Sequence, residues 1–169
     1  MLRSGYKIEV STERDQHRRI PQKWVRHVAV GTLSAEKVAV RSKVEILLAG
    51  DDTVRALNHQ YRLQDTITDV LSFPGSQDDN EFPEFSVSHN DIGQVILSVP
   101  QAKRQADEAH IDIKKEAAHL IVHGILHLLD YDHENTTDGK LMHSRENAIL
   151  YELADFRPHS STRGIHGSE

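Results

Sequence analysis

The stretch LIVHGILHLL, residues 120–129, decides how this chain folds, because its apolar side chains would cover nearly the whole circumference of a helix. Such a helix must be buried, so we expect it at the centre of the molecule. His123 and His127 lie four residues apart and therefore leave the same face of this helix, one turn apart. Buried imidazoles need polar partners, and this spacing suits two rings that share one metal ion.

A third histidine, His133, follows after residues 130–132, a stretch that can turn the chain back toward the helix. Three protein ligands leave a tetrahedral zinc ion one open position for water, which is typical of a catalytic site. The chain has no cysteine, so a metal site must use His, Asp or Glu. We therefore predict one zinc ion held by His123, His127 and His133. The alternative is that these are core or surface histidines with ordinary hydrogen bonds.

His119 lies one turn before His123 on the same helix face. It is predicted either to orient a metal ligand or touch substrate, or to be a packed, hydrogen-bonded histidine. In zinc proteases with this histidine spacing, a glutamate directly after the first histidine is the general base. Here that position is Gly124, so the sequence lacks the general base that peptide hydrolysis would need at this point. A metal-bound water, whose pKa zinc can lower to roughly 7, remains available for hydrolysis.

The periodicity of the remaining sequence predicts an α+β fold, with a small mixed β-sheet packed with helices around a zinc-metalloprotease-like histidine helix. The expected strands are residues 6–10, 42–49, 69–73 and 91–98. The expected helices are residues 21–30, a helix capped by Asp51 or Asp52 that runs through Tyr61, and residues 100–109, 111–129 and 138–153. Residues 75–90 have no helical period and are expected to form a surface loop.

The length of 169 residues fits one domain of ordinary size. We expect residues 1–156 to form a single catalytic, metal-dependent hydrolase domain and residues 157–169 to be a disordered tail. No stretch approaches the roughly 20 apolar residues that span a bilayer, and the N-terminus lacks the pattern of a secretion signal. The sequence therefore predicts a cytoplasmic protein without a membrane partner.

Charge is unevenly distributed along the chain, whose net charge is −6. Residues 1–50 hold ten basic and five acidic side chains, whereas residues 51–169 hold ten basic and twenty-one acidic ones. Five of the early cations lie close together in the sequence, and they are Arg14, Arg18, Arg19, Lys23 and Arg26. They predict either a surface that meets a phosphate backbone or an ordinary solvated helix face.

Two blocks of this sequence resemble the YbeY family of bacterial zinc-dependent endoribonucleases, which act in ribosomal RNA maturation. The first block is HGILHLLDYDH, residues 123–133, and the second comprises Leu57-Asn58, Tyr61-Arg62 and TDVLSFP at residues 68–74. The similarity runs over most of residues 40–153. It implies a single-strand-specific endoribonuclease that uses one zinc ion for phosphodiester hydrolysis in ribosomal RNA maturation and ribosome quality control. The implied partners are ribosomal RNA or the small ribosomal subunit, with ribosomal or assembly-factor proteins.

The same resemblance places Arg62 in the substrate cleft as a catalytic residue. A guanidinium can hold phosphate oxygens through two parallel hydrogen bonds and can stabilise charge that develops on a phosphoryl centre. The alternative for Arg62 is a structural ion pair with Asp65 or Asp69. Asp69 and Ser72 match family positions too, but strand packing and a turn also explain them, so we assign neither a catalytic role.

Two positions depart from the family pattern. Asp130 stands where the family usually has glycine, and Ile67 stands where proline is common. If position 130 needs a left-handed backbone, aspartate tolerates it at a cost on the order of 1 kcal/mol.

Two other functions stay open from the sequence: a zinc-dependent peptidase or amidohydrolase, and a ribosome-assembly factor with a structural zinc.

Overall fold

The computed structural model describes residues 5–16, 19–65, 68–75, 90–132 and 135–155, and the structural statements below refer to these ranges. His133, Arg18 and Ile67 lie outside the described residues. So do most of the expected loop at 75–90 and the whole of the expected tail at 157–169.

Four strands form one mixed sheet in the order β1-β2-β4-β3. They are β1 (Lys7–Thr12), β2 (Ser42–Ala49), β3 (Val70–Pro74) and β4 (Asn90–Ser98). The β1, β2 and β4 strands are parallel to one another, and β3 runs antiparallel to β4 at an edge of the sheet. The predicted α+β fold with a small mixed sheet is confirmed.

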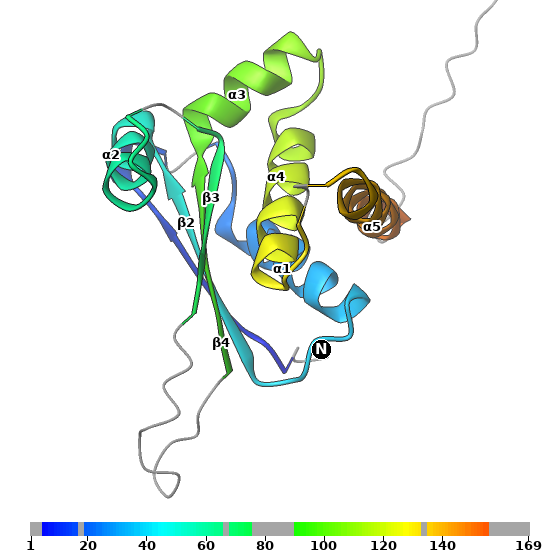
Figure 1. The fold of residues 1–169 in the computed structure, drawn as a ribbon. Helices are drawn as coiled ribbons and strands as arrows, with labels where there is room; N and C mark the ends of the chain where they lie inside the picture. The colour runs from blue at the N-terminus through cyan, green and yellow to red at the C-terminus, as the bar shows by residue number, and fades with distance from the viewer. Residues whose placement is uncertain (1–4, 17–18, 66–67, 76–89, 133–134, 156–169) are drawn as a thin grey trace, which may run out of the picture.

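Five α-helices surround the sheet: α1 (Gln22–Ala35), α2 (Asp51–Arg62), α3 (Val99–Glu108), α4 (Ile113–Leu128) and α5 (Thr136–Asp155). A short 3-10 turn, Arg14–Gln16, follows β1. The α1, α4 and α5 helices lie on one side of the sheet and α2 lies on the other (Figure 1). From Ala117 onward most of the α4 helix is buried between the sheet, α1 and α5, as the all-round apolar sequence of residues 120–129 predicts.

Gly124 allows α4 to lie close to the sheet. A Cβ atom there would come within 2.8 Å of Cγ1 of Val95 on β4, closer than carbon atoms normally pack. At the same point the Ser72 hydroxyl of β3 donates a hydrogen bond of 2.9 Å to the Gly124 carbonyl. The position after the first histidine therefore faces the sheet, and a glutamate side chain there would be directed into the core.

The end of α1 and the N-cap of α2 differ from the sequence expectation, whereas the other helix ends lie within about two residues of it. The α1 helix continues past Gly31 to Ala35, and Gly31 packs directly against Leu153 of α5, where a larger side chain would clash. The N-cap of α2 is Gly50, so the prediction of Asp51 or Asp52 as the cap is wrong. The Asp51 carboxylate instead accepts hydrogen bonds from Ser98 and Arg104, at 2.9 and 2.8 Å.

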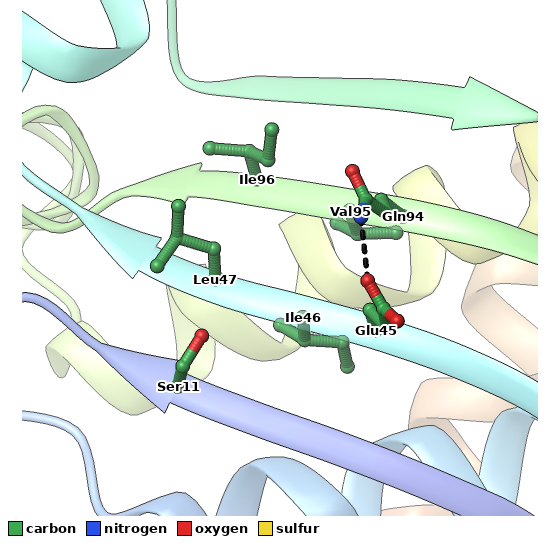
Figure 2. A pocket seen from close by; sticks show the side chains of 7 residues that line it. All are labelled: Ser11, Glu45, Ile46, Leu47, Gln94, Val95 and Ile96. Atoms are coloured by element: carbon green, nitrogen blue, oxygen red, sulfur yellow. Dashed lines mark hydrogen bonds between the residues drawn. The ribbon is translucent and has the colours of Figure 1, made fainter.

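The α2 side of the sheet is only partly covered. Figure 2 shows a shallow hollow there, where side chains of β1, β2 and β4 point outward and Gln94 donates a hydrogen bond to Glu45. Its lining includes Ser11, Leu47 and Ile96. It holds no histidine and lies on the opposite face from α4, so it is separate from the candidate site described next.

Candidate metal centre

His119, His123 and His127 lie on successive turns of α4, with ring centroids 6.2 and 4.6 Å apart. The Nε2 atoms of His123 and His127 are 3.1 Å apart. Two imidazoles bound tetrahedrally to one zinc ion at 2.0–2.1 Å have their nitrogens roughly 3.4 Å apart. The structure thus brings His123 and His127 together at nearly the separation that a shared ion requires.

A buried carboxylate, Glu146 of α5, lies behind the histidines. Its side chain is only 5% exposed. One oxygen lies 2.5 Å from Nδ1 of His123, and the other lies 3.1 Å from Nε2 of His119. Nδ1 of His143 lies 3.8 Å from the second oxygen. Glu146 therefore holds the rings of two neighbouring turns of α4 in fixed orientations.

The ionisation of Glu146 determines which nitrogen of His123 carries the proton. Burial raises the pKa of Glu146, but the hydrogen bonds from His119 and His123 outweigh burial and lower its pKa to about 2. The carboxylate is then ionised at neutral pH and accepts a hydrogen bond from Nδ1 of His123. In neutral His123 this leaves a lone pair on Nε2, directed toward His127, where a metal ligand needs it. The hydrogen bond to Glu146 also raises the pKa of His119.

Glu146 was not identified from the sequence, although the sequence contains a signal for it. Met142 and Ile149 are buried on α5, and Glu146 lies between them at helical spacing. A charged residue in the apolar stripe of an amphipathic helix is costly unless it is paired. This pattern could have marked Glu146 as a partner for one of the histidines.

We expect Glu146→Gln to weaken metal binding without removing a proposed ligand. A glutamine amide is neutral, so it stabilises the required form of His123 less well than a carboxylate. Loss of such a supporting partner typically lowers metal affinity by about 10- to 100-fold. Competition between the purified protein and a zinc-binding dye measures the effect. Glu152→Gln, at an exposed position on the same helix, is the matched control. Equal zinc affinity for the wild type and Glu146→Gln would contradict this role.

The turn after α4 is held by defined contacts. Asp130 has φ of 69°, and the N–H groups of Asp130 and Tyr131 donate to the carbonyls of His127 and Leu126. This is the usual hydrogen-bond pattern of a helix that ends on a left-handed residue, where glycine is commonest. Asp130 therefore adopts the left-handed conformation that was considered for this position from the sequence.

Glu36, at the end of α1, connects this turn to the last helix. The Tyr131 hydroxyl donates to one carboxylate oxygen of Glu36 at 2.7 Å, and Nε of Arg145 donates to the other at 2.8 Å. The Glu36 side chain is only 11% exposed. Arg145 precedes Glu146 on α5, so Glu36 links the turn after α4 to the helix segment that supports His123.

Arg62 ends α2 on the other side of the sheet, and its side chain is exposed. Asp65 forms a two-pronged ion pair with Arg55, at 2.7 and 3.2 Å. The Asp69 carboxylate accepts from the Val70 N–H at 2.8 Å and from Gln105 at 3.4 Å. Arg62 forms no hydrogen bond or ion pair with another described residue, so neither aspartate provides the structural ion pair considered above. No described contact joins Arg62 to the histidines either.

Within the described ranges, no group of three or more His, Asp or Glu side chains is arranged to hold a metal ion. Because His133 lies outside those ranges, the three-histidine zinc site stays a prediction. No helix in the described part of the chain has the length and apolar character needed to cross a membrane.

Comparisons with known proteins identify the family. The family model described as Endoribonuclease YbeY matches residues 7–154. An endoribonuclease YbeY from Desulforamulus reducens is 37% identical over 131 residues, which cover 78% of this chain and 85% of the relative. One from Bradyrhizobium diazoefficiens is 34% identical over 141 residues, which cover 83% and 76%. The solution structure of TM1509 from Thermotoga maritima is 24% identical in sequence, and the match covers 97% of this chain and 99% of the TM1509 chain. The TM-score of 0.60 shows that the two proteins share the fold. From the family match and these relatives, the chain belongs to the endoribonuclease YbeY family.

Proposed function

We propose that this protein is a single-strand-specific, zinc-dependent endoribonuclease that acts in the cytoplasm in ribosomal RNA maturation and ribosome quality control. Family membership supports RNA cleavage. The observation that carries the metal assignment is the 3.1 Å separation of two imidazole nitrogens, with the lone pair of His123 fixed by Glu146. This donor set fits zinc, which binds neutral imidazole nitrogens whose second ring nitrogen donates to a carboxylate.

In this proposal His123, His127 and His133 hold one zinc ion within a catalytic domain of residues 1–156. Bound zinc supplies Lewis acidity and can lower the pKa of a water ligand to roughly 7. Glu146 keeps His123 in the required protonation state and holds His119 in place beside it. His119, whose side chain is 43% exposed, is the neighbouring group available to substrate. Arg62 binds phosphate oxygens and neutralises their charge.

The first part of the chain supplies cations that can hold RNA. Arg14, Arg19 and Lys23 are exposed, and none of them has a hydrogen-bond or ion-pair partner among the described residues. Arg26 is exposed too and donates to the Ile8 carbonyl at 3.4 Å. Free cations of this kind bind phosphate groups without reading the base sequence. They support an RNA partner, such as ribosomal RNA or the small ribosomal subunit with its associated proteins.

Peptide hydrolysis is the less favoured activity. In zinc proteases the residue after the first histidine is a glutamate that serves as general base. Here Gly124 faces Val95 and Ser72 of the sheet, so no side chain from this position can reach the histidine face.

The proposed function is tested by giving the purified protein RNA and protein substrates. A single-stranded RNA, its perfect duplex and casein are incubated with zinc-loaded protein and with protein treated with a chelator. We expect zinc-loaded protein to cleave the single-stranded RNA, chelation to stop cleavage and added zinc to restore it. Cleavage of casein with the RNA left intact would overturn the assignment.

A further inference from the structure

The end of α2 exposes apolar side chains on both sides of Arg62. Tyr61 is 60% exposed and Leu63 is 86% exposed. Tyr61 lies at helical spacing from Val54 and Leu57, the inward residues of α2, so it continues the stripe that faces the sheet. Its ring leans on Phe73 of β3, with centroids 5.2 Å apart at 60°. The ring is thus held by an aromatic neighbour while most of its surface stays accessible.

Leu63 has an unusual backbone for a leucine. Its φ is 57°, in the left-handed region where glycine or asparagine is less strained. Burial does not compensate for this strain, because the side chain is almost fully exposed. Glycine at this helix end would make the folded protein more stable. An exposed, strained leucine beside an exposed tyrosine is consistent with a contact made to something other than this chain.

The charge at this position favours a nucleic acid as the partner. Arg62 lies between the two apolar residues and has no partner among the described residues, whereas the nearby Asp65 is neutralised by Arg55. Proteins that bind single-stranded nucleic acid combine cations for the phosphates with aromatic rings on which bases stack. Tyr61 and Arg62 provide one of each at adjacent positions.

The edge strand β3 lies between this position and the histidine face. Alternate residues of β3 point to opposite sides of the sheet, so Phe73 contacts Tyr61 while the adjacent Ser72 contacts Gly124 of α4. No described strand continues the sheet beyond β3. A flexible single strand can pass around this edge from one side to the other, whereas a duplex is too stiff to bend over a few nucleotides.

We propose that Tyr61 and Leu63 form a stacking platform that holds a base of single-stranded RNA while Arg62 holds the adjacent phosphate, so that the RNA passes around β3 to the histidine face. This inference rests on the proposed function and names the part of the surface that selects single strands. Arg62 then acts from the α2 side of the sheet and needs no direct contact with the histidines.

Binding measured without cleavage tests the platform. A short fluorescein-labelled single-stranded RNA with cleavage-resistant linkages and its duplex are titrated with each zinc-loaded protein, and fluorescence anisotropy reports the dissociation constant. Loss of one stacked base weakens binding by about 5- to 150-fold. We expect Tyr61→Leu to weaken binding of the single strand within this range and to leave duplex binding unchanged. Tyr61→Phe keeps the ring and should bind like the wild type.

Two further variants separate a binding role from a structural one. Tyr151 is 71% exposed on α5, so Tyr151→Leu is the matched control and should bind like the wild type. Leu63→Gly relieves the left-handed strain, so it should raise the melting temperature yet weaken single-strand binding by about 2- to 10-fold, less than loss of a stacked base. A higher melting temperature together with weaker RNA binding is not expected if Leu63 is purely structural.

The outcomes distinguish this inference from the proposed function. If the wild type binds single-stranded RNA and both Tyr61→Leu and Leu63→Gly bind it equally well, the platform is wrong and the proposed function stands. Equal weakening by Tyr151→Leu would also overturn the platform. If the wild type binds no single-stranded RNA at all, the proposed function fails together with the platform.

Discussion

Replacing His127 with alanine is expected to abolish metal-dependent RNA cleavage while the protein stays folded. The substitution removes one of the two imidazole nitrogens that lie 3.1 Å apart, and the apolar side chains that bury α4 remain in place. Alanine is also a better helix former than histidine. Loss of a supporting partner alone costs about 10- to 100-fold in metal affinity or activity, so loss of a ligand should lower both by at least about 100-fold. Zinc content, cleavage rate and thermal melting of the purified variant measure the result.

His27→Ala is the matched control, because His27 is an exposed histidine on α1 and is not one of the proposed metal ligands. It should keep its zinc and its activity. If His127→Ala is unfolded, the metal is structural, and the assembly-factor function replaces the enzymatic one. If His127→Ala folds and cleaves RNA at the wild-type rate, His127 has no part in the centre.

Replacing Arg62 with alanine is expected to lower the cleavage rate at low RNA concentration by about 10- to 150-fold, because a hydrogen bond from a charged group to phosphate contributes about 1.5–3 kcal/mol. The side chain is exposed and contributes no described ion pair to the fold, so thermal stability and zinc content should stay unchanged. Arg62→Lys should retain part of the activity, because an ammonium keeps the charge but cannot form two parallel hydrogen bonds to phosphate. Single-turnover cleavage measured both below and at saturating RNA separates the loss of binding from a loss in the chemical step.

Arg55→Ala provides the matched control for Arg62. Arg55 is an exposed arginine on the same helix, and its guanidinium is already paired with Asp65. It should cleave RNA at nearly the wild-type rate and lose little stability, since solvent screens an exposed ion pair. A wild-type rate for Arg62→Ala would remove Arg62 from the mechanism. Loss of zinc from Arg62→Ala would show instead that Arg62 supports the structure of the centre.

The sequence predicted those features that depend on spacing along one element. His123 and His127 lie on the same face of a helix because they are four residues apart. The burial of α4 follows from its all-round apolar character. Most helices and strands were predicted within a few residues for the same reason. The similarity of two sequence blocks predicted the family, which the comparisons confirm.

Features that depend on contacts between distant residues were not predicted. The pairing of Glu146 with His123 joins two helices across 23 residues, and no periodicity specifies which side chains meet there. The absence of space for a side chain at Gly31 of α1 is due to Leu153, more than a hundred residues away. The choice of Gly50 over Asp51 as the cap of α2 depends on Ser98 and Arg104, which bind the Asp51 carboxylate.

The carboxylate of Glu36 has a consequence for when the centre can form. Translation produces α1 and α4 before α5, and domains begin to fold from their N-terminal parts during synthesis. Yet Arg145 and Glu146, which complete the contacts of Glu36 and His123, both belong to α5. A nascent chain that ends before residue 146 therefore lacks the support that orients its histidines. A nuclease built in this way would become active only after its α5 helix has been synthesised.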